Sequence, residues 1–116
     1  MTSKRVITLE TSNDTTTDIF TLNTTINTGY LLNFEAIAYN TTDNKSGSIS
    51  GMIKINQGSI NTTPTVSNII NYITILDSEL SLISVDNTIS NNTFKLNITG
   101  EQSKNIKWRI LIKIVS

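Results

Sequence analysis

Apolar and polar residues alternate along four segments of the chain, and this alternation predicts β-strands. Because successive side chains of a strand point to opposite faces of a sheet, a period of two marks a strand with one buried face. The four segments are Tyr30–Tyr39, Ser48–Ile55, Phe94–Ile98 and Ile106–Val115. The last has the clearest pattern, since five apolar residues alternate with positions that are mostly Lys or Arg. We expect it to be a strand with one complete apolar face.

Four further segments carry a weaker strand pattern. They are Lys4–Glu10, Ile19–Leu22, Ile69–Leu76 and Leu80–Val85. A helix over Ser67–Leu80 is the alternative for part of this set, because apolar residues also recur there at mixed spacing. We favour a strand, since its isoleucines are β-branched and neither a good cap nor a strong helix former supports the helix.

About eight short strands separated by turn-rich spacers predict an all-β protein, an antiparallel β-sandwich of jelly-roll-like form. Pro64 lies in a connection between strands, where its missing N–H costs no ladder hydrogen bond. Gly51, inside a predicted strand, favours a bulge or a close backbone approach. No βαβ alternation or repeat marks a second domain, so residues 1–116 are expected to form a single β-sandwich domain. An extended N-terminal arm is the alternative for residues 1–14.

The composition supports a protein of strands and turns and excludes several chemistries. Thr, Ile, Asn and Ser make up about 57% of the chain, although an AT-rich genome would produce part of the same bias. The chain has no Cys and no His, which excludes disulfides, cysteine-rich zinc sites and catalysis by Cys–His or Ser–His–Asp groups. Nine basic and nine acidic residues balance, so the charge gives no reason to expect nucleic acid or an anionic membrane as a partner.

The N-terminal sequence predicts neither export nor membrane insertion. Lys4 and Arg5 are not followed by the apolar stretch of a signal peptide. The longest apolar run is far shorter than the ~18 residues that a membrane span requires. We therefore expect a soluble protein made in a reducing cytoplasm, in which the Asn-x-Ser/Thr triplets follow from the composition and are not glycosylated.

Carboxylates are the acid–base groups that remain, and nothing in the sequence pairs them as a glycosidase requires. Asp14 with Asp18, and Asp43 with Asn44, offer oxygen ligands for a cation such as Ca²⁺, but turn formation explains the same residues. The five glycines form no Gly-x-Gly phosphate loop. We therefore expect no enzymatic activity, no cofactor and no metal site.

Trp108, the single tryptophan, has two interpretations. Aromatic rings serve as platforms for sugars, but Trp108 is in phase with Ile106 and Ile110 on the apolar face of its strand. That phase favours a ring buried in the core or at a subunit interface.

Two strands are also apolar on part of their second face. Leu111 and Val115 lie opposite the Trp108 face, and Leu31, Ile37 and Tyr39 lie opposite the core face of their own strand. A monomer would leave these side chains in water, so they predict contact with a neighbouring subunit.

The C-terminal third resembles the ending of small β-rich modules in virion structural proteins of tailed phages and large DNA viruses. Those modules end with a strand that closes on V-T-G, a polar spacer and an I-x-W motif that opens an alternating terminal strand. The matching segments here are Leu96–Gly100 and Asn105–Val115, and upstream Thr28–Asn40 resembles the strand that carries F-E-A. The polar turn Asp43–Gly47 and the strand after it follow the same pattern, so the resemblance spans residues 15–116. This chain departs from the family in being much richer in Asn and Ile.

The resemblance implies a non-enzymatic virion surface or accessory module, acting through self-assembly as a capsid decoration protein or a head-fibre or tail component. It implies a homotrimer located in the virion, in contact with other virion proteins and without shared active-site residues. The charge balance and the short apolar runs add the expectation of no nucleic acid and no membrane as partners. The alternative function is a carbohydrate- or receptor-binding tip domain of a phage fibre. The aromatic residues argue against that alternative because all of them fall inside predicted strands. The candidate assembly surface is Trp108, Leu111, Lys113 and Val115.

Overall fold

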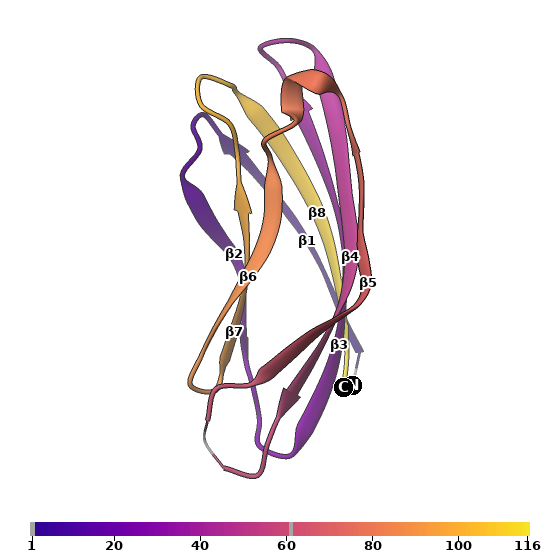
Figure 1. The fold of residues 1–116 in the computed structure, drawn as a ribbon, viewed down its shortest axis with the longest axis vertical. Coiled ribbons are helices and arrows are strands. Elements are labelled where there is room, and N and C mark those ends of the chain that lie inside the picture. Colours follow the sequence, from indigo (N-terminus) through magenta and orange to yellow (C-terminus); the bar gives the residue numbers. More distant parts are fainter. Residues whose placement is uncertain (1, 61) are drawn as a thin grey trace.

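The protein is a sandwich of two antiparallel β-sheets (Figure 1). The computed structural model describes residues 2–60 and 62–116, and the side chains of residues 68–73 and 79 lie outside that description. Across the described residues the elements are β1 (Thr2–Thr11), β2 (Thr16–Asn23), β3 (Thr28–Asn40), β4 (Lys45–Gln57), β5 (Thr65–Leu76), the 3₁₀ helix η1 (Ser78–Leu80), β6 (Ser84–Ser90), β7 (Thr93–Thr99) and β8 (Ile106–Val115).

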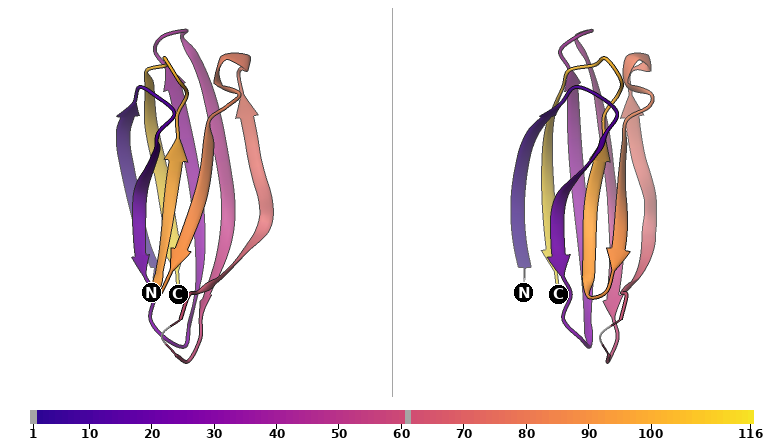
Figure 2. Two further views of the ribbon diagram at one scale, coloured as in Figure 1. Left: turned by 60° about the vertical axis from the view of Figure 1, so that its left-hand side comes forward. Right: turned by 90° about the vertical axis from the view of Figure 1, so that its left-hand side faces the viewer.

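The strand order is β1-β8-β3-β4-β5 in the larger sheet and β2-β7-β6 in the smaller sheet. The chain crosses between the sheets after β1, β2, β5 and β7, which interleaves them as in a jelly roll, whereas β3, β4 and β5 follow one another as a meander (Figure 2). The prediction of an all-β antiparallel sandwich is therefore confirmed.

The predicted alternation places the core between the two sheets. Along β8 every second side chain is buried, from Ile106 to Ile114, and the residues between them face solvent. In β3 the buried set is the one that the sequence predicted, Leu32, Phe34 and the two alanines. The smaller sheet contributes the remaining layer of the core, with Phe20, Val85, Phe94, Leu96 and Ile98.

The middle of the chain follows the strand prediction with one exception. Thr65–Leu76 is a strand, so the helix alternative over Ser67–Leu80 is wrong. The register between β4 and β5 shifts on both sides of Met52, but the extra residues belong to β5, and Gly51 pairs in regular register with Phe34 of β3. The predicted strand Leu80–Val85 is wrong, because Leu80 closes the short 3₁₀ helix and the strand begins at Ser84. Leu80 is fully buried, so its apolar character reflects a core contact made by a loop.

The N-terminal segment belongs to the larger sheet. It pairs residue by residue with β8 from Thr2 opposite Val115 to Thr11 opposite Ile106, so β1 is an edge strand and not a detached arm. Beyond β1 the chain turns tightly against the β7–β8 connection, where a Cβ atom on Gly100 would lie 2.5 Å from Thr11 Oγ1. Glycine is therefore required where these two connections meet.

Candidate functional site

The outer face of the larger sheet carries exposed apolar side chains next to the C-terminal strand. The register places Val6 of β1 directly beside Leu111, and Leu31 of β3 beside Val115. Val6 is 54% exposed and Leu111 is 39% exposed. We call Val6, Leu31, Leu111 and Val115 the apolar patch. Side chains paired in this way are neighbours on one face, and the row of Lys4, Lys113 and Asn33 lies between the two pairs.

The structure divides the four residues that the sequence assigned to an assembly surface. Leu111, Lys113 and Val115 lie together on the outer face of β8. Trp108 is 2% exposed and faces the core, where its Nε1 donates a 2.9 Å hydrogen bond to Thr11 Oγ1. Residues an odd number of positions apart in a strand point to opposite faces, so Trp108 cannot share a surface with Leu111. Its inclusion in the assembly surface was wrong, whereas the prediction of a buried ring is confirmed.

Val6 is the member of the apolar patch that sequence reasoning missed as a surface residue. Its neighbours Ile7 and Leu9 alternate onto the inner face, which leaves Val6 on the outer face. The alternation of β1 was visible in the sequence, but pairing with a strand about a hundred residues away was not. Without that pairing, nothing connected Val6 to Leu111.

Charges are distributed unevenly around the molecule. By register, the outer face of the larger sheet carries two carboxylates, Glu10 and Glu35. The same face carries five cations, Lys4, Lys54, Lys107, Arg109 and Lys113. Because the chain as a whole has equal numbers of acids and bases, this face is basic and the rest of the molecule is acidic.

The outer face of the smaller sheet has a different character. Its charged residues are Asp18, Asp86 and Lys95, and Lys95 Nζ lies 3.8 Å from Asp18 Oδ2. The other outward positions that the register places on this face are Thr16, Thr21, Asn23, Ser84, Thr88, Ser90, Thr93, Asn97 and Thr99. All twelve positions on this face are polar or charged, with an excess of carboxylate.

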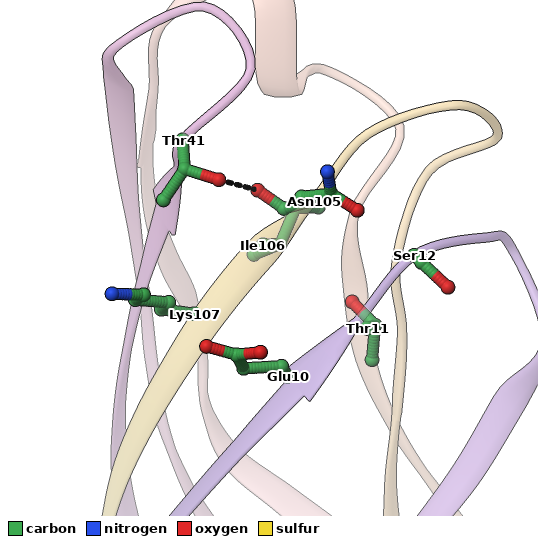
Figure 3. A pocket seen from close by; sticks show the side chains of 7 residues that line it. All are labelled: Glu10, Thr11, Ser12, Thr41, Asn105, Ile106 and Lys107. Carbon is green, nitrogen blue, oxygen red and sulfur yellow. Dashed lines mark hydrogen bonds between the residues drawn. The ribbon is translucent and has the colours of Figure 1, made fainter.

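A polar cavity of about 280 Å³ lies where β1, β8 and the end of β3 meet. Figure 3 shows Thr41 and Lys107 on one side of the opening and Thr11 and Ser12 on the other. The full lining is Glu10, Thr11, Ser12, Thr41, Asn105, Ile106 and Lys107. Hydroxyl, amide, carboxylate and ammonium groups therefore surround one opening.

Hydrogen bonds between two turns form one wall of this cavity. Thr41 N and Thr41 Oγ1 both donate to the Asn105 carbonyl, at 2.8 and 3.1 Å, and Asn105 N donates to Thr42 Oγ1 at 3.0 Å. An ion pair joins the same turns, with Lys104 Nζ 2.6 Å from Asp43 Oδ2. The hydrogen bond from Lys104 and a second one from Asn40 lower the pKa of Asp43 below its ordinary value of 3.8. The turns are thus held together as one unit.

The groups around the cavity are hydrogen-bond donors and acceptors with one carboxylate among them. Glu10 is the single carboxylate among the cavity residues, whereas acid–base hydrolysis of a glycoside uses a pair. Within the described residues, no three His, Cys, Asp or Glu side chains gather as a metal site. No helix in the described chain is long and apolar enough to cross a membrane. No protein-family model matches this sequence, and a search of curated proteins gives no match.

Proposed function

We propose that this protein is a non-enzymatic structural module of a virion that assembles with copies of itself into a homotrimer through the outer face of the larger sheet. The observation that carries the proposal is the apolar patch, since Leu111 and Val115 lie outside a core that is already complete. Patches of this kind are typical of protein–protein contacts.

Apolar burial supplies most of the expected association energy. Removing apolar surface from water contributes about 25 cal/mol per Å². Exposed ion pairs contribute only ~0–1 kcal/mol each. The cations around the apolar patch, Lys4 and Lys113 among them, are therefore expected to set the orientation of the contact more than its strength.

The uneven charge favours a ring over a two-fold dimer. In a two-fold contact the same surface meets itself, which would place the basic outer face of the larger sheet against an identical basic face. In a ring each subunit presents one surface to a different surface of the next. The acidic outer face of the smaller sheet, with Asp18 and Asp86, complements the basic face. A closed trimer is the smallest such ring.

The resemblance to virion modules supports the biological setting. On that ground we assign the protein to the virion, as a capsid decoration protein or a head-fibre or tail component in contact with other virion proteins. Mass spectrometry of purified particles, with copy numbers, tests the assignment. Hundreds of copies are expected for capsid decoration and a few for a tail or vertex position, and absence from the particles would contradict the proposal.

Sedimentation equilibrium at micromolar concentration tests the assembly itself. The expected species is three times the monomer mass of 12.8 kDa. A monomer or a dimer under these conditions would contradict the trimer. The alternative function, recognition of a carbohydrate or receptor, is favoured by a separate observation beside the polar cavity.

A further inference from the structure

A shallow groove of about 550 Å³ adjoins the polar cavity on the outer face of the larger sheet. Glu10 and Lys107 line both hollows, so the two form one continuous cleft. The register sets Glu10, Lys107 and Tyr39 side by side across β1, β8 and β3. The groove adds Thr8, Ile37 and Arg109 to the lining, together with Leu9 and the inward-facing Trp108.

Several polar groups of this cleft are not engaged within the protein. Among the described residues, the Glu10 carboxylate, the Ser12 hydroxyl, the Asn105 amide and the Lys107 ammonium make no side-chain hydrogen bond or ion pair of their own. They supply donors and acceptors from three directions around the opening (Figure 3). A planar carboxylate and a planar amide can each form paired hydrogen bonds with neighbouring hydroxyl groups of a polyol.

Tyr39 gives the cleft an aromatic surface. It is 42% exposed, and its hydroxyl donates a 3.2 Å hydrogen bond to Asn44 Oδ1, which fixes the orientation of the ring. The sequence argument against carbohydrate binding was that the aromatic residues fall in strands and not in loops, but Tyr39 is exposed although it lies in a strand. An exposed, oriented ring beside unpaired polar groups is the combination by which proteins hold a sugar, with its C–H face on the ring.

We propose that this cleft binds an acidic saccharide. Arg109 and Lys107 outnumber the Glu10 carboxylate, which favours a ligand carrying negative charge. A guanidinium pairs with a carboxylate through two parallel hydrogen bonds, so Arg109 is expected to hold the acidic group of a uronic acid. Tyr39 then contacts the sugar ring, while Glu10, Ser12 and Asn105 bind its hydroxyl groups.

The cleft and the apolar patch occupy different parts of the same face. Arg109 is the cleft residue next to the apolar patch, two residues from Leu111 along β8, or about 7 Å at the usual rise of a strand. The apolar patch lies toward the chain termini, and the cleft lies toward the β3–β4 turn. The trimer contact proposed above and the cleft therefore share a border between Leu111 and Arg109.

The Trp108 indole N–H reports on the cleft through its hydrogen bond to Thr11. Its hydrogen-bond acceptor, Thr11 Oγ1, belongs to a residue that lines the polar cavity, and the chain has one tryptophan, so its nitrogen–proton NMR signal is unambiguous. The full chain is titrated separately with trigalacturonate, maltotriose and tetraglutamate. We expect trigalacturonate to give a saturable shift and maltotriose to bind at least about tenfold more weakly, because it lacks the carboxylates.

Matched variants separate the cleft from the rest of the sheet. Tyr39→Ala is expected to weaken trigalacturonate binding about tenfold, and Tyr39→Phe, which keeps the ring, to retain most of it. Arg109→Gln should abolish the preference over maltotriose. Lys54→Gln removes a cation from the same face outside the cleft and should leave binding unchanged. The proposal is overturned if neither sugar gives a saturable shift, if Tyr39→Ala binds as the unmodified protein does, or if tetraglutamate binds and trigalacturonate does not.

Discussion

The two sheets present similar inner faces and contrasting outer faces. Inside, both contribute isoleucine, leucine and phenylalanine to a single core. Outside, the larger sheet carries the apolar patch and an excess of cations, whereas the smaller sheet carries threonine, serine and asparagine with an excess of carboxylate. Folding requires only the inner faces to be apolar. The outer faces are not needed for the core, so the contrast between them points to what the molecule contacts.

The outer face of the smaller sheet shows what a solvated face of this fold looks like. Its central strand, β7, presents Thr93, Lys95 and Thr99 outward in partial contact with solvent, and Asn97 on the same face is 4% exposed. In the larger sheet β8, which like β7 has a neighbour on both sides, presents Leu111 and Val115 outward. Both strands alternate with a period of two. The outward positions of β7 show that such a strand can carry hydroxyl, amide and ammonium groups on its outer face. The leucine and valine on β8 therefore need a reason other than folding, and subunit contact provides one.

The largest expected effect is loss of assembly when the apolar patch is broken. Leu111→Asp places a carboxylate at the centre of the proposed contact, where its desolvation opposes association. We expect sedimentation to report monomers, while far-ultraviolet circular dichroism keeps the signature of β-structure, because Leu111 is outside the core. A trimer that survives this change would contradict the assignment of the contact to this face.

Ile60→Asp is the control for that experiment. Ile60 is 67% exposed, more than Leu111, but it lies in the connection between β4 and β5 and not in a strand of either sheet. A carboxylate again replaces a branched aliphatic side chain, but outside both sheets, so the trimer should persist. Dissociation by both variants would indicate general destabilisation, and it would contradict the assignment of the subunit contact to the apolar patch.

A smaller effect is expected from reversing charges on the two contrasting faces. Lys113→Glu and Asp86→Lys should each weaken association about fivefold per contact, since an exposed ion pair contributes ~0–1 kcal/mol. The double variant should recover most of the loss, because opposite charges face each other again. Sedimentation over a concentration series measures all three proteins.

The same variants distinguish the ring from a two-fold contact. If the larger sheets met face to face, Lys113→Glu would relieve repulsion between like charges and strengthen association. Asp86→Lys would then have no effect, because the smaller sheet would be outside the contact. Either result would contradict the proposed ring and leave the apolar patch as a two-fold interface.

The inner faces could be predicted from the sequence because their signal is local. The alternation in β3 and β8 identified Leu32, Phe34, Ile110 and Ile112 as core residues, and all four are buried. Leu80 shows where this reasoning fails. Its apolar side chain extended a strand prediction into a loop, because burial by tertiary contact outside a strand leaves no period of two to detect.

The outer-face sites could be predicted only in part, because they depend on strand order. Leu111 and Val115 were identified from their own strand, but Val6 became their neighbour through a pairing that no local pattern specifies. The cleft was missed for the same reason. Glu10, Tyr39 and Lys107 come from three strands far apart in the sequence, and each is unremarkable alone. Register, not residue type, brings them together.

The smallest expected effect concerns the turns at the ends of the two sheets. The β3–β4 turn and the β6–β7 turn each place an asparagine in the left-handed region, Asn44 with φ 55° and Asn92 with φ 54°. Only the first turn holds a carboxylate with a shifted pKa, Asp43, whose pKa is lowered chiefly by the hydrogen bond from Lys104. A group whose pKa falls on folding stabilises the folded state above its unfolded pKa. That contribution disappears as the pH falls through the lower folded value.

Asp43→Asn should therefore reduce the free energy of unfolding by a constant small amount from pH 5 to 7, and the difference should shrink below pH 3.8. Urea unfolding of both proteins between pH 2 and 7 measures it. Lys104→Gln, which removes the main cause of the lowered pKa, should flatten the same acidic limb, and a difference that persists unchanged at pH 2 would show that Asp43 acts through packing and not through its charge.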